Sequence, residues 1–253
     1  FLDFNEVVFN MSENLDKYWD YGKKLEQYLR PATFPIAIKL IKKENEIPSN
    51  SRTPQKDLKI QNFICQNFSM VRRYGWTVAI TEQDCICRLA RAVYGWDTVS
   101  EEMAEWGHQF NIGLYAKDLE TSKKLQKHLY IFNNEYMGLV ISPLTRTKVV
   151  PDVVQIYCLP AQAMRLTQAY LYMEGGMLEF TDAGRIGSCH IGVIKTFQTD
   201  KPQLVILGNG DRVWGGAEDH EVMYSIPGSK LDIIIEGLEA THSAGLRYPI
   251  PKY

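Results

Sequence analysis

Glycine is unevenly distributed along this chain, and this distribution constrains the fold more than any other feature. Twelve of the 18 glycines follow residue 150. Glycine is unfavourable inside helices and is used where a backbone turns tightly or closely approaches another group. We therefore expect an α+β fold, with a helix-rich N-terminal half and, in the C-terminal half, a mixed sheet connected by glycine-rich loops.

Hydrophobic periodicity predicts the individual elements of this fold. Apolar residues recur at helical spacing in some segments and form short apolar runs in others. The predicted helices cover residues 11–30, 84–94, 98–110, 118–130, 160–174 and 229–241, and the predicted strands cover residues 34–41, 76–80, 137–141 and 153–157. Residues 58–72 fit either a strand or a helix. We expect a single α+β domain over residues 1–253, or two lobes with a seam near residues 143–152.

Charge and cysteine usage limit the class of protein. The net charge of -2 argues against a nucleic-acid partner, because such domains are usually basic. The sequence has no apolar run near the roughly 20 residues that cross a bilayer, and its first residues lack the pattern of a signal peptide. An odd number of irregularly spaced cysteines does not predict a disulfide framework. We therefore expect a cytoplasmic protein that binds neither nucleic acid nor a membrane.

Two glycine-rich loops in the second half have the composition of a ligand site. Residues 184–192 include Gly187, and residues 208–216 include Gly210 and Arg212. Backbone amides in such turns can cradle an anion, and the Arg212 guanidinium could hold a carboxylate or phosphate through two hydrogen bonds. Gly187, Gly210 and Arg212 are therefore candidates for binding a small anionic molecule. The alternative for the second loop is a structural hairpin in which Arg212 forms a salt bridge.

Three further features have both a functional and a structural interpretation. Arg165 lies among apolar residues of the predicted 160–174 helix, where it would either clamp an anion beside the first glycine-rich loop or form a buried ion pair. The acidic segment 218–221 could bind a hard metal or supply a general base, but a solvated turn is the favoured interpretation. The aromatic residues between Tyr74 and Trp106 would belong to the core, or form a wall around an apolar ligand.

The order of motifs from Pro151 to Pro251 resembles that of one family. The motifs are Pro151-Asp152-Val153-Val154, Pro160-Ala161-Gln162-Ala163-Met164-Arg165-Leu166, Gly187-Ser188-Cys189, Gly210-Asp211-Arg212, Ser225-Ile226-Pro227 and Glu236-Gly237-Leu238. On these motifs the chain resembles the ArCR-type family of archaeal and bacterial proteins, domain of unknown function 169. Residues 34–39 resemble the opening strand of the family, so the resemblance covers roughly residues 30–251. It implies a cytoplasmic protein common in anaerobes, with no settled activity.

The resemblance also bears on the cysteines. Cys65 and Cys87 fall where the family tends to have cysteines. Cys85 and Cys158 are not expected from the family pattern. Thiolates are soft ligands that suit iron–sulfur clusters, zinc or copper(I). Cys65, Cys87 and Cys189 therefore predict a metal site, most simply a [4Fe-4S] cluster in which one iron is open to a substrate or takes a fourth ligand.

The fourth ligand would be Cys85, Cys158 or His190. If the chain around Cys85 is helical, Cys85 and Cys87 do not share a face, and only one of them reaches a given metal. The alternative is that all of the cysteines are ordinary buried thiols, because the chain contains no CxxC pair. A Cys-His hydrolase built on Cys189 and His190 is disfavoured, since neighbours in a strand point to opposite faces.

These observations leave three hypotheses for the function. The first is an iron–sulfur or other cysteine-ligated metal protein, acting as a redox or small-molecule-transforming enzyme component in anaerobic metabolism. The second is a non-catalytic accessory module that binds a small molecule or anion and whose cysteines are structural. The third is a homo-oligomer or a subunit of a larger complex. The sequence does not decide whether the protein is an enzyme.

Overall fold

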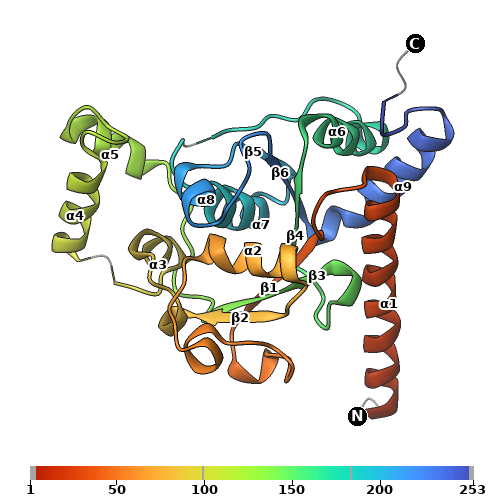
Figure 1. The fold of residues 1–253 in the computed structure, drawn as a ribbon, viewed down its shortest axis with the longest axis horizontal. Helices are drawn as coiled ribbons and strands as arrows, with labels where there is room; N and C mark the ends of the chain where they lie inside the picture. The colour runs from red at the N-terminus through yellow and green to blue at the C-terminus, as the bar shows by residue number, and fades with distance from the viewer. Residues whose placement is uncertain (1–3, 99, 183, 251–253) are drawn as a thin grey trace.

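The computed structural model describes residues 4–98, 100–182 and 184–250 of the chain, and it is built around one sheet of six strands (Figure 1). The strand order is β2-β3-β1-β4-β6-β5, and every pair of neighbours is antiparallel. The strands are β1 (Ile36–Ile41), β2 (Val78–Thr81), β3 (Gly138–Pro143), β4 (Val153–Cys158), β5 (Gln203–Val205) and β6 (Val222–Pro227). The α+β class is confirmed, but the sheet is antiparallel rather than mixed, and it draws two strands, β1 and β2, from the first half.

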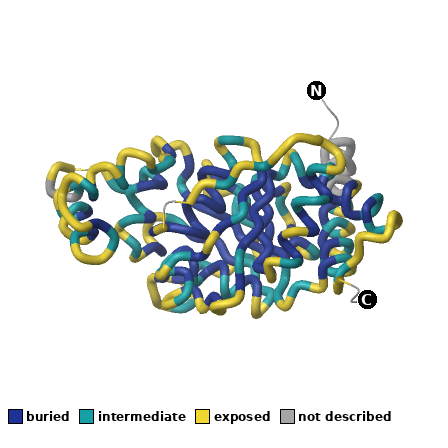
Figure 2. The backbone as a smooth tube through the Cα atoms, turned by 90° about the horizontal axis from the view of Figure 1, so that it is seen from above, coloured by how far each residue is buried: buried dark blue, intermediate teal, exposed yellow. Residues whose placement is uncertain are grey.

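Helices cover both faces of the sheet. The helices are α1 (Phe4–Leu29), α2 (Ile64–Tyr74), α3 (Arg88–Tyr94), α4 (Glu101–Asn111), α5 (Leu119–Lys127), α6 (Pro160–Glu174), α7 (Thr196–Thr199), α8 (Asn209–Val213) and α9 (Leu231–Ser243), with a π-helical segment η5 (Gly187–Lys195) before α7. One core layer joins the sheet to α2, α3 and η5, and the other joins it to α1, α6 and α9. The buried residues between these layers form the dark centre of Figure 2.

Alternation along the strands separates the two layers. In β4, Tyr157 packs with α2 and η5, whereas its neighbour Cys158 packs with α6 and α9. Successive strand residues point to opposite faces, so this separation is fixed by the pleat. Strand β1 pairs with both β3 and β4, so the sheet is continuous across residues 143–152. The division into one domain or two lobes stays a prediction.

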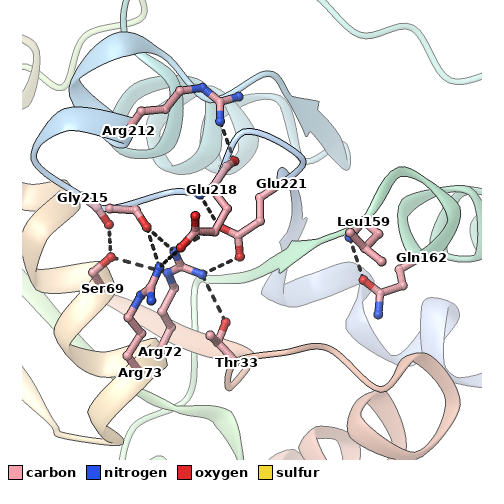
Figure 3. Close-up of polar contacts among 11 residues, drawn as sticks. Thr33, Ser69, Arg72, Arg73, Leu159, Gln162, Arg212, Gly215, Glu218 and Glu221 are labelled. Atoms are coloured by element: carbon pink, nitrogen blue, oxygen red, sulfur yellow. Dashed lines mark hydrogen bonds and ion pairs between the residues drawn. The ribbon is translucent and has the colours of Figure 1, made fainter.

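Local sequence signals account for several helix boundaries. Helix α6 begins at Pro160, which suits the first helical position. The Leu159 N–H donates to the Gln162 Oε1 atom at 2.6 Å (Figure 3). Helix α6 ends before Gly175, as predicted. The undecided segment 58–72 contains the start of α2, which ends at Gly75 in the left-handed conformation that glycine adopts readily.

The π-helical segment η5 was not predicted. All nine of its residues are buried, so it shows no alternation between an apolar and a polar face. Position 192 within this segment requires a glycine, because a Cβ atom there would overlap Met223 Cε and lie 2.7 Å from Gln155 Nε2. The glycine therefore permits a buried helical segment to lie directly on β4 and β6, where the sequence indicated a loop.

Helices α4 and α5 form an arm beside the main body, at the left of Figure 1. The buried Ser122 hydroxyl links them, since it accepts a hydrogen bond from Asn111 Nδ2 at 2.9 Å and lies 3.2 Å from His108 Nδ1. The arm contributes aromatic side chains to the cavity described below. Among the described helices, none is both long enough and apolar enough to cross a bilayer.

Candidate functional site

A cavity of about 440 Å³ lies between α2, α3, α4, η5 and α8. Its lining includes three of the five cysteines, Cys65, Cys87 and Cys189, together with both predicted glycines, Gly187 and Gly210. Cys65 lies in the first turn of α2, Cys87 immediately precedes α3, and Cys189 lies in η5. Cysteines from three segments that are distant in the sequence therefore line the same cavity.

Close packing between α2 and the loop of α8 positions Cys65. A Cβ atom at Gly215 would lie 3.1 Å from Cys65 Cβ and 2.7 Å from the Asp211 carbonyl oxygen. The Cys65 Sγ atom lies 3.6 Å from the Gly210 carbonyl oxygen. The second glycine-rich loop contains a short helix, α8, instead of the hairpin of the predicted alternative, but Arg212 does form the salt bridge of that alternative, with its Nη1 atom 3.8 Å from Asp219 Oδ1. The glycines of this loop allow α8 to approach Cys65.

Burial keeps the three thiols protonated in the metal-free protein. It raises the pKa of Cys65, of Cys87 and, well above the usual range, of Cys189. The negative charge of Asp211 adds to the effect on all three. The rise in the pKa of Cys87 is partly offset, because its Sγ atom accepts a hydrogen bond from the Ala90 N–H at 3.5 Å and because the positive charge of Arg185 favours the thiolate.

Arg185 is the most unusual residue of the cavity wall. Only 7% of it is exposed, yet none of its three guanidinium nitrogens has a hydrogen-bond partner among the described residues. Its guanidinium carbon lies 5.8 Å from the ring centres of both Phe110 and Tyr115. Burial lowers the pKa of Arg185. Buried charged groups are normally paired, so this residue of the cavity lining keeps unused donors that are covered from solvent.

Asp211, unlike Arg185, is a buried charged group whose two carboxylate oxygens both accept hydrogen bonds. The Ser188 hydroxyl donates to its Oδ1 atom, while the N–H groups of Ser188 and Gly208 donate to its Oδ2 atom at 3.2 and 3.0 Å. Burial raises the pKa of Asp211, and these donors oppose the rise. A Cβ atom at Gly187 would overlap Asp211 Oδ2. Gly187 therefore makes room for this carboxylate rather than for a ligand.

Aromatic side chains form the rest of the wall. The rings of Phe63 and Trp214 stack with centres 4.9 Å apart, and those of Trp106 and Phe110 stack with centres 5.4 Å apart. Trp96, by contrast, is buried in the core, where its Nε1 atom donates to the Tyr136 carbonyl oxygen at 2.8 Å. Of the two interpretations of the aromatic region, Trp106 therefore fits the cavity wall, and Trp96 fits the hydrophobic core.

Neither of the predicted arginines lines the cavity. The Arg212 Nη1 atom donates to the Glu218 carbonyl oxygen at 2.5 Å (Figure 3). Arg165 lies on α6, in the layer across the sheet, where it donates to Thr241 Oγ1 and Gln168 Oε1 at 2.9 and 2.8 Å. The structure thus does not bring Arg165 to the Cys189 loop, because α6 packs on the opposite face.

Residues 218–220 form an exposed turn, as favoured from the sequence, but the last residue of the acidic segment, Glu221, is a buried anchor. Glu221 is buried and forms an ion pair of 2.8 Å with Arg72, whose side chain is fully buried (Figure 3). Glu218 forms an exposed ion pair of 3.2 Å with Arg73. Both arginines belong to α2, so the segment after α8 is fastened to the helix that carries Cys65.

The three proposed fourth ligands lie elsewhere. Cys85 is buried outside the cavity lining, its pKa raised to about 12 by burial. Cys158 lies across the sheet, and burial likewise raises its pKa to about 12. The His190 Nε2 atom accepts a hydrogen bond from the Tyr130 N–H at 2.8 Å, and burial lowers its pKa to about 4. Of Cys85 and Cys87, therefore, it is Cys87 that lines the cavity.

Cys189 and His190 occupy a helical segment instead of the strand that was assumed for them. Their side chains still diverge, because Cys189 lines the cavity while His190 faces Tyr130. Within the described residues, no three His, Cys, Asp or Glu side chains form a group that could hold a metal ion. A single-ion site is therefore not preformed at the cavity.

Sequence reasoning missed Arg185, Ser188 and Asp211. All three lie in the glycine-rich loops that it singled out, and all belong to or adjoin the family motifs. The signal that could have found Arg185 is its place two residues before Gly187, within the same loop as Cys189. Nothing in the sequence shows that its guanidinium lacks a partner.

Comparisons with known proteins place the chain in a family. An uncharacterized protein of the archaeon Methanocaldococcus jannaschii is 27% identical over 239 residues, which cover 94% of this chain and 96% of that protein. No solved structure matches the chain. The family model described as uncharacterised ArCR, domain of unknown function 169, matches residues 24–237. These residues include all of the cysteines and the whole cavity lining. The chain therefore belongs to the ArCR family, domain of unknown function 169.

Proposed function

We propose that the protein holds a [4Fe-4S] cluster in its cavity through Cys65, Cys87 and Cys189. The observation that carries this proposal is that thiols from three distant segments line one cavity. Cysteine thiolates are the usual ligands of iron–sulfur clusters. The protein would act as a redox or small-molecule-transforming component of anaerobic metabolism, and the cavity would also admit a small anionic molecule.

The arrangement of donors favours a cluster over a single ion. Each cysteine of a [4Fe-4S] cluster binds a different iron atom, so the sulfur atoms need not meet around one point. This suits three thiols that line the same cavity without forming a group for one ion. With Cys85, Cys158 and His190 outside the lining, a fourth iron would remain open to a ligand.

The charges around the cavity also support the proposal. Burial opposes ionisation of the three thiols, and metal binding supplies the positive charge that stabilises the thiolates. The unpaired guanidinium of Arg185 adds a positive charge beside a cluster whose thiolate ligands make it anionic. The donor set and its surroundings are therefore compatible with this group.

A bound cluster would supply an electron-transfer centre or an iron atom open to a ligand. The residues of the chain would provide the surroundings. The stacked rings of Phe63 and Trp214 would limit access of water. Asp211, with a pKa raised by burial, would hold or release a proton at the cavity wall. We expect a cytoplasmic location, since each of the five cysteines is a free thiol.

The test is anaerobic purification of the full chain, followed by reconstitution with iron and sulfide. We expect a broad absorption band near about 400 nm and about four irons per chain. Single Cys65→Ser, Cys87→Ser and Cys189→Ser variants should each lose most of the iron. Cys158→Ser is the matched control, because Cys158 is also a buried free thiol but lies across the sheet. Absence of iron from the reconstituted wild type, or full iron in the triple variant, would overturn the proposal.

A second candidate function is supported by a different observation. The unpaired guanidinium of Arg185 would suit a non-catalytic module that binds an anion, with the cysteines as structural thiols. In that case the protein would take up no iron, and a Cys65→Ser, Cys87→Ser, Cys189→Ser triple variant would bind its ligand as tightly as the wild type does. Measuring iron and ligand binding on the same preparations separates the two functions.

A further inference from the structure

The cavity contains a charge that the protein itself does not neutralise. Arg185 is nine-tenths buried, and its Nε, Nη1 and Nη2 atoms are unpaired within the described residues. Asp211, the only carboxylate in the cavity lining that the structure describes, is already engaged by Ser188 and Gly208. An unpaired buried cation is costly, so its retention in a largely apolar wall indicates an external anionic partner.

We infer that the cavity binds a small monocarboxylate with an apolar body, and that Arg185 holds the carboxylate group. This inference rests on the proposal that the cavity is the functional site. It also replaces Arg212 and Arg165 as anion-binding residues, because their guanidinium groups already have partners elsewhere. The planar fork of an arginine matches the two oxygens of a carboxylate, which it binds through two parallel hydrogen bonds.

The number of buried cations favours a carboxylate over a phosphate. Arg185 is buried, whereas Arg88, the other arginine of the lining, is exposed and lies 5.1 Å from the ring centre of Trp106. One buried guanidinium balances the single charge of a carboxylate. A phosphate group carries more charge and three acceptor oxygens, which this wall does not satisfy. Arg88 is placed to attract anions to the cavity rather than to hold them inside it.

The walls and size of the cavity define the body of the ligand. Stacked aromatic pairs, Phe63 with Trp214 and Trp106 with Phe110, form much of the surface. Phe110 and Tyr115 approach both the cavity and Arg185, so the charged and apolar parts of the site are adjacent. The volume of about 440 Å³ lies within the range of small-molecule sites. An aromatic or short branched acyl group therefore suits the walls.

The experiment measures binding of benzoate to the full chain by isothermal titration calorimetry. Benzamide, which has the same shape and no charge, is the matched ligand control, and acetate tests the apolar contribution. We expect benzoate to bind at least about tenfold more tightly than either, since each lacks one of the two interactions. Wild-type protein that binds benzoate no more tightly than benzamide would overturn the inference.

Variants assign the carboxylate to Arg185. Arg185→Gln should weaken benzoate binding by at least about thirtyfold and leave benzamide binding unchanged. Arg185→Lys should recover part of the affinity, because the charge is kept and the fork is lost. Arg212→Gln is the matched control, because its guanidinium is bonded to the Glu218 carbonyl outside the lining, and it should bind benzoate as the wild type does. Loss of binding in Arg212→Gln with retention in Arg185→Gln would contradict the assignment.

Each titration is repeated on metal-free and on iron-reconstituted protein, so the two proposals fail separately. Carboxylate binding that depends on Arg185 in a protein that takes up no iron would sustain this inference and reject the cluster. Iron binding by Cys65, Cys87 and Cys189 without any preference for a carboxylate would do the reverse. Thermal unfolding of Arg185→Gln in the absence of ligand confirms that a lost affinity does not arise from a lost fold.

Discussion

The Arg72 Nη1 atom lies 2.8 Å from the Glu221 Oε1 atom, and this buried ion pair fixes one side of the cavity. Arg72 belongs to α2, the helix that carries Cys65, and Glu221 follows the loop that carries α8. The ring of Tyr157 lies beneath the guanidinium, whose carbon is 4.1 Å from the ring centre. The pair therefore fastens the segment that follows α8 to α2.

Breaking this pair should destabilise the protein strongly. Glu221→Gln leaves the fully buried guanidinium of Arg72 without its countercharge, so we expect the free energy of unfolding to fall by about 3–5 kcal/mol. Glu218→Gln is the control, because it breaks the exposed ion pair with Arg73 and should cost at most about 1 kcal/mol. Urea denaturation followed by circular dichroism measures both values. Equal losses in the two variants would contradict the structural role given to Glu221.

Removing the unpaired charge of Arg185 should have the opposite effect. In the absence of metal and ligand, Arg185→Met removes three buried donors that have no acceptor. We therefore expect the free energy of unfolding to rise by about 1–3 kcal/mol. Arg165→Met, which removes a buried guanidinium bonded to Thr241 and Gln168, should instead destabilise. Thermal unfolding of metal-free protein distinguishes the two. A destabilised Arg185→Met variant would mean that Arg185 has a partner within the folded chain.

The fold could be predicted where local residues mark the ends of an element. Helix α6 was predicted over the residues that it occupies, because Pro160 and Gly175 mark its ends. The segment η5 could not be predicted in this way. Its residues are buried on every side, so the sequence has no period there, and Gly192 looked like a loop residue although it serves close packing.

The sequence predicted the cysteines of the candidate site but not the buried arginine that lines it. Cysteine type and family motifs grouped Cys65, Cys87 and Cys189, and the cavity contains all three. Arg212 was chosen over Arg185 because a sequence shows which side chains are cationic, not which are already bonded. Arg212 forms the predicted alternative of a salt bridge, with Asp219. It also donates to the backbone carbonyl of Glu218, and a backbone acceptor leaves no mark in the sequence.

The two glycines of the predicted site should respond differently to the same substitution. Gly187→Ala places a methyl group against Asp211 Oδ2 and 3.1 Å from the Gly208 nitrogen, so we expect a loss of about 1–3 kcal/mol in stability. At Gly210 the nearest atom to an added Cβ is Trp214 Cδ1, at 3.9 Å. Gly210→Ala lies within α8 and should be neutral, or stabilising by at most about 1 kcal/mol. Paired melting temperatures test this difference, and equal destabilisation would contradict the packing described for Gly187.

Arg185 and Cys87 should also be coupled through the ionisation of the thiol. Burial raises the pKa of Cys87, while the charge of Arg185 partly lowers it. In metal-free protein, alkylation of Cys87 by iodoacetamide should therefore be slow at neutral pH and rise through alkaline pH, since the thiolate is the reactive form.

Arg185→Gln removes the lowering influence, so the pKa of Cys87 rises further and less thiolate is present at any given pH. We expect the alkylation profile, followed at Cys87 by mass spectrometry, to move to higher pH in this variant. Arg212→Gln should leave the profile where it is, because its guanidinium is bonded outside the cavity lining. Identical profiles for Arg185→Gln and the wild type would show that the guanidinium does not act on the thiol, and would remove Arg185 from the electrostatics of the cavity.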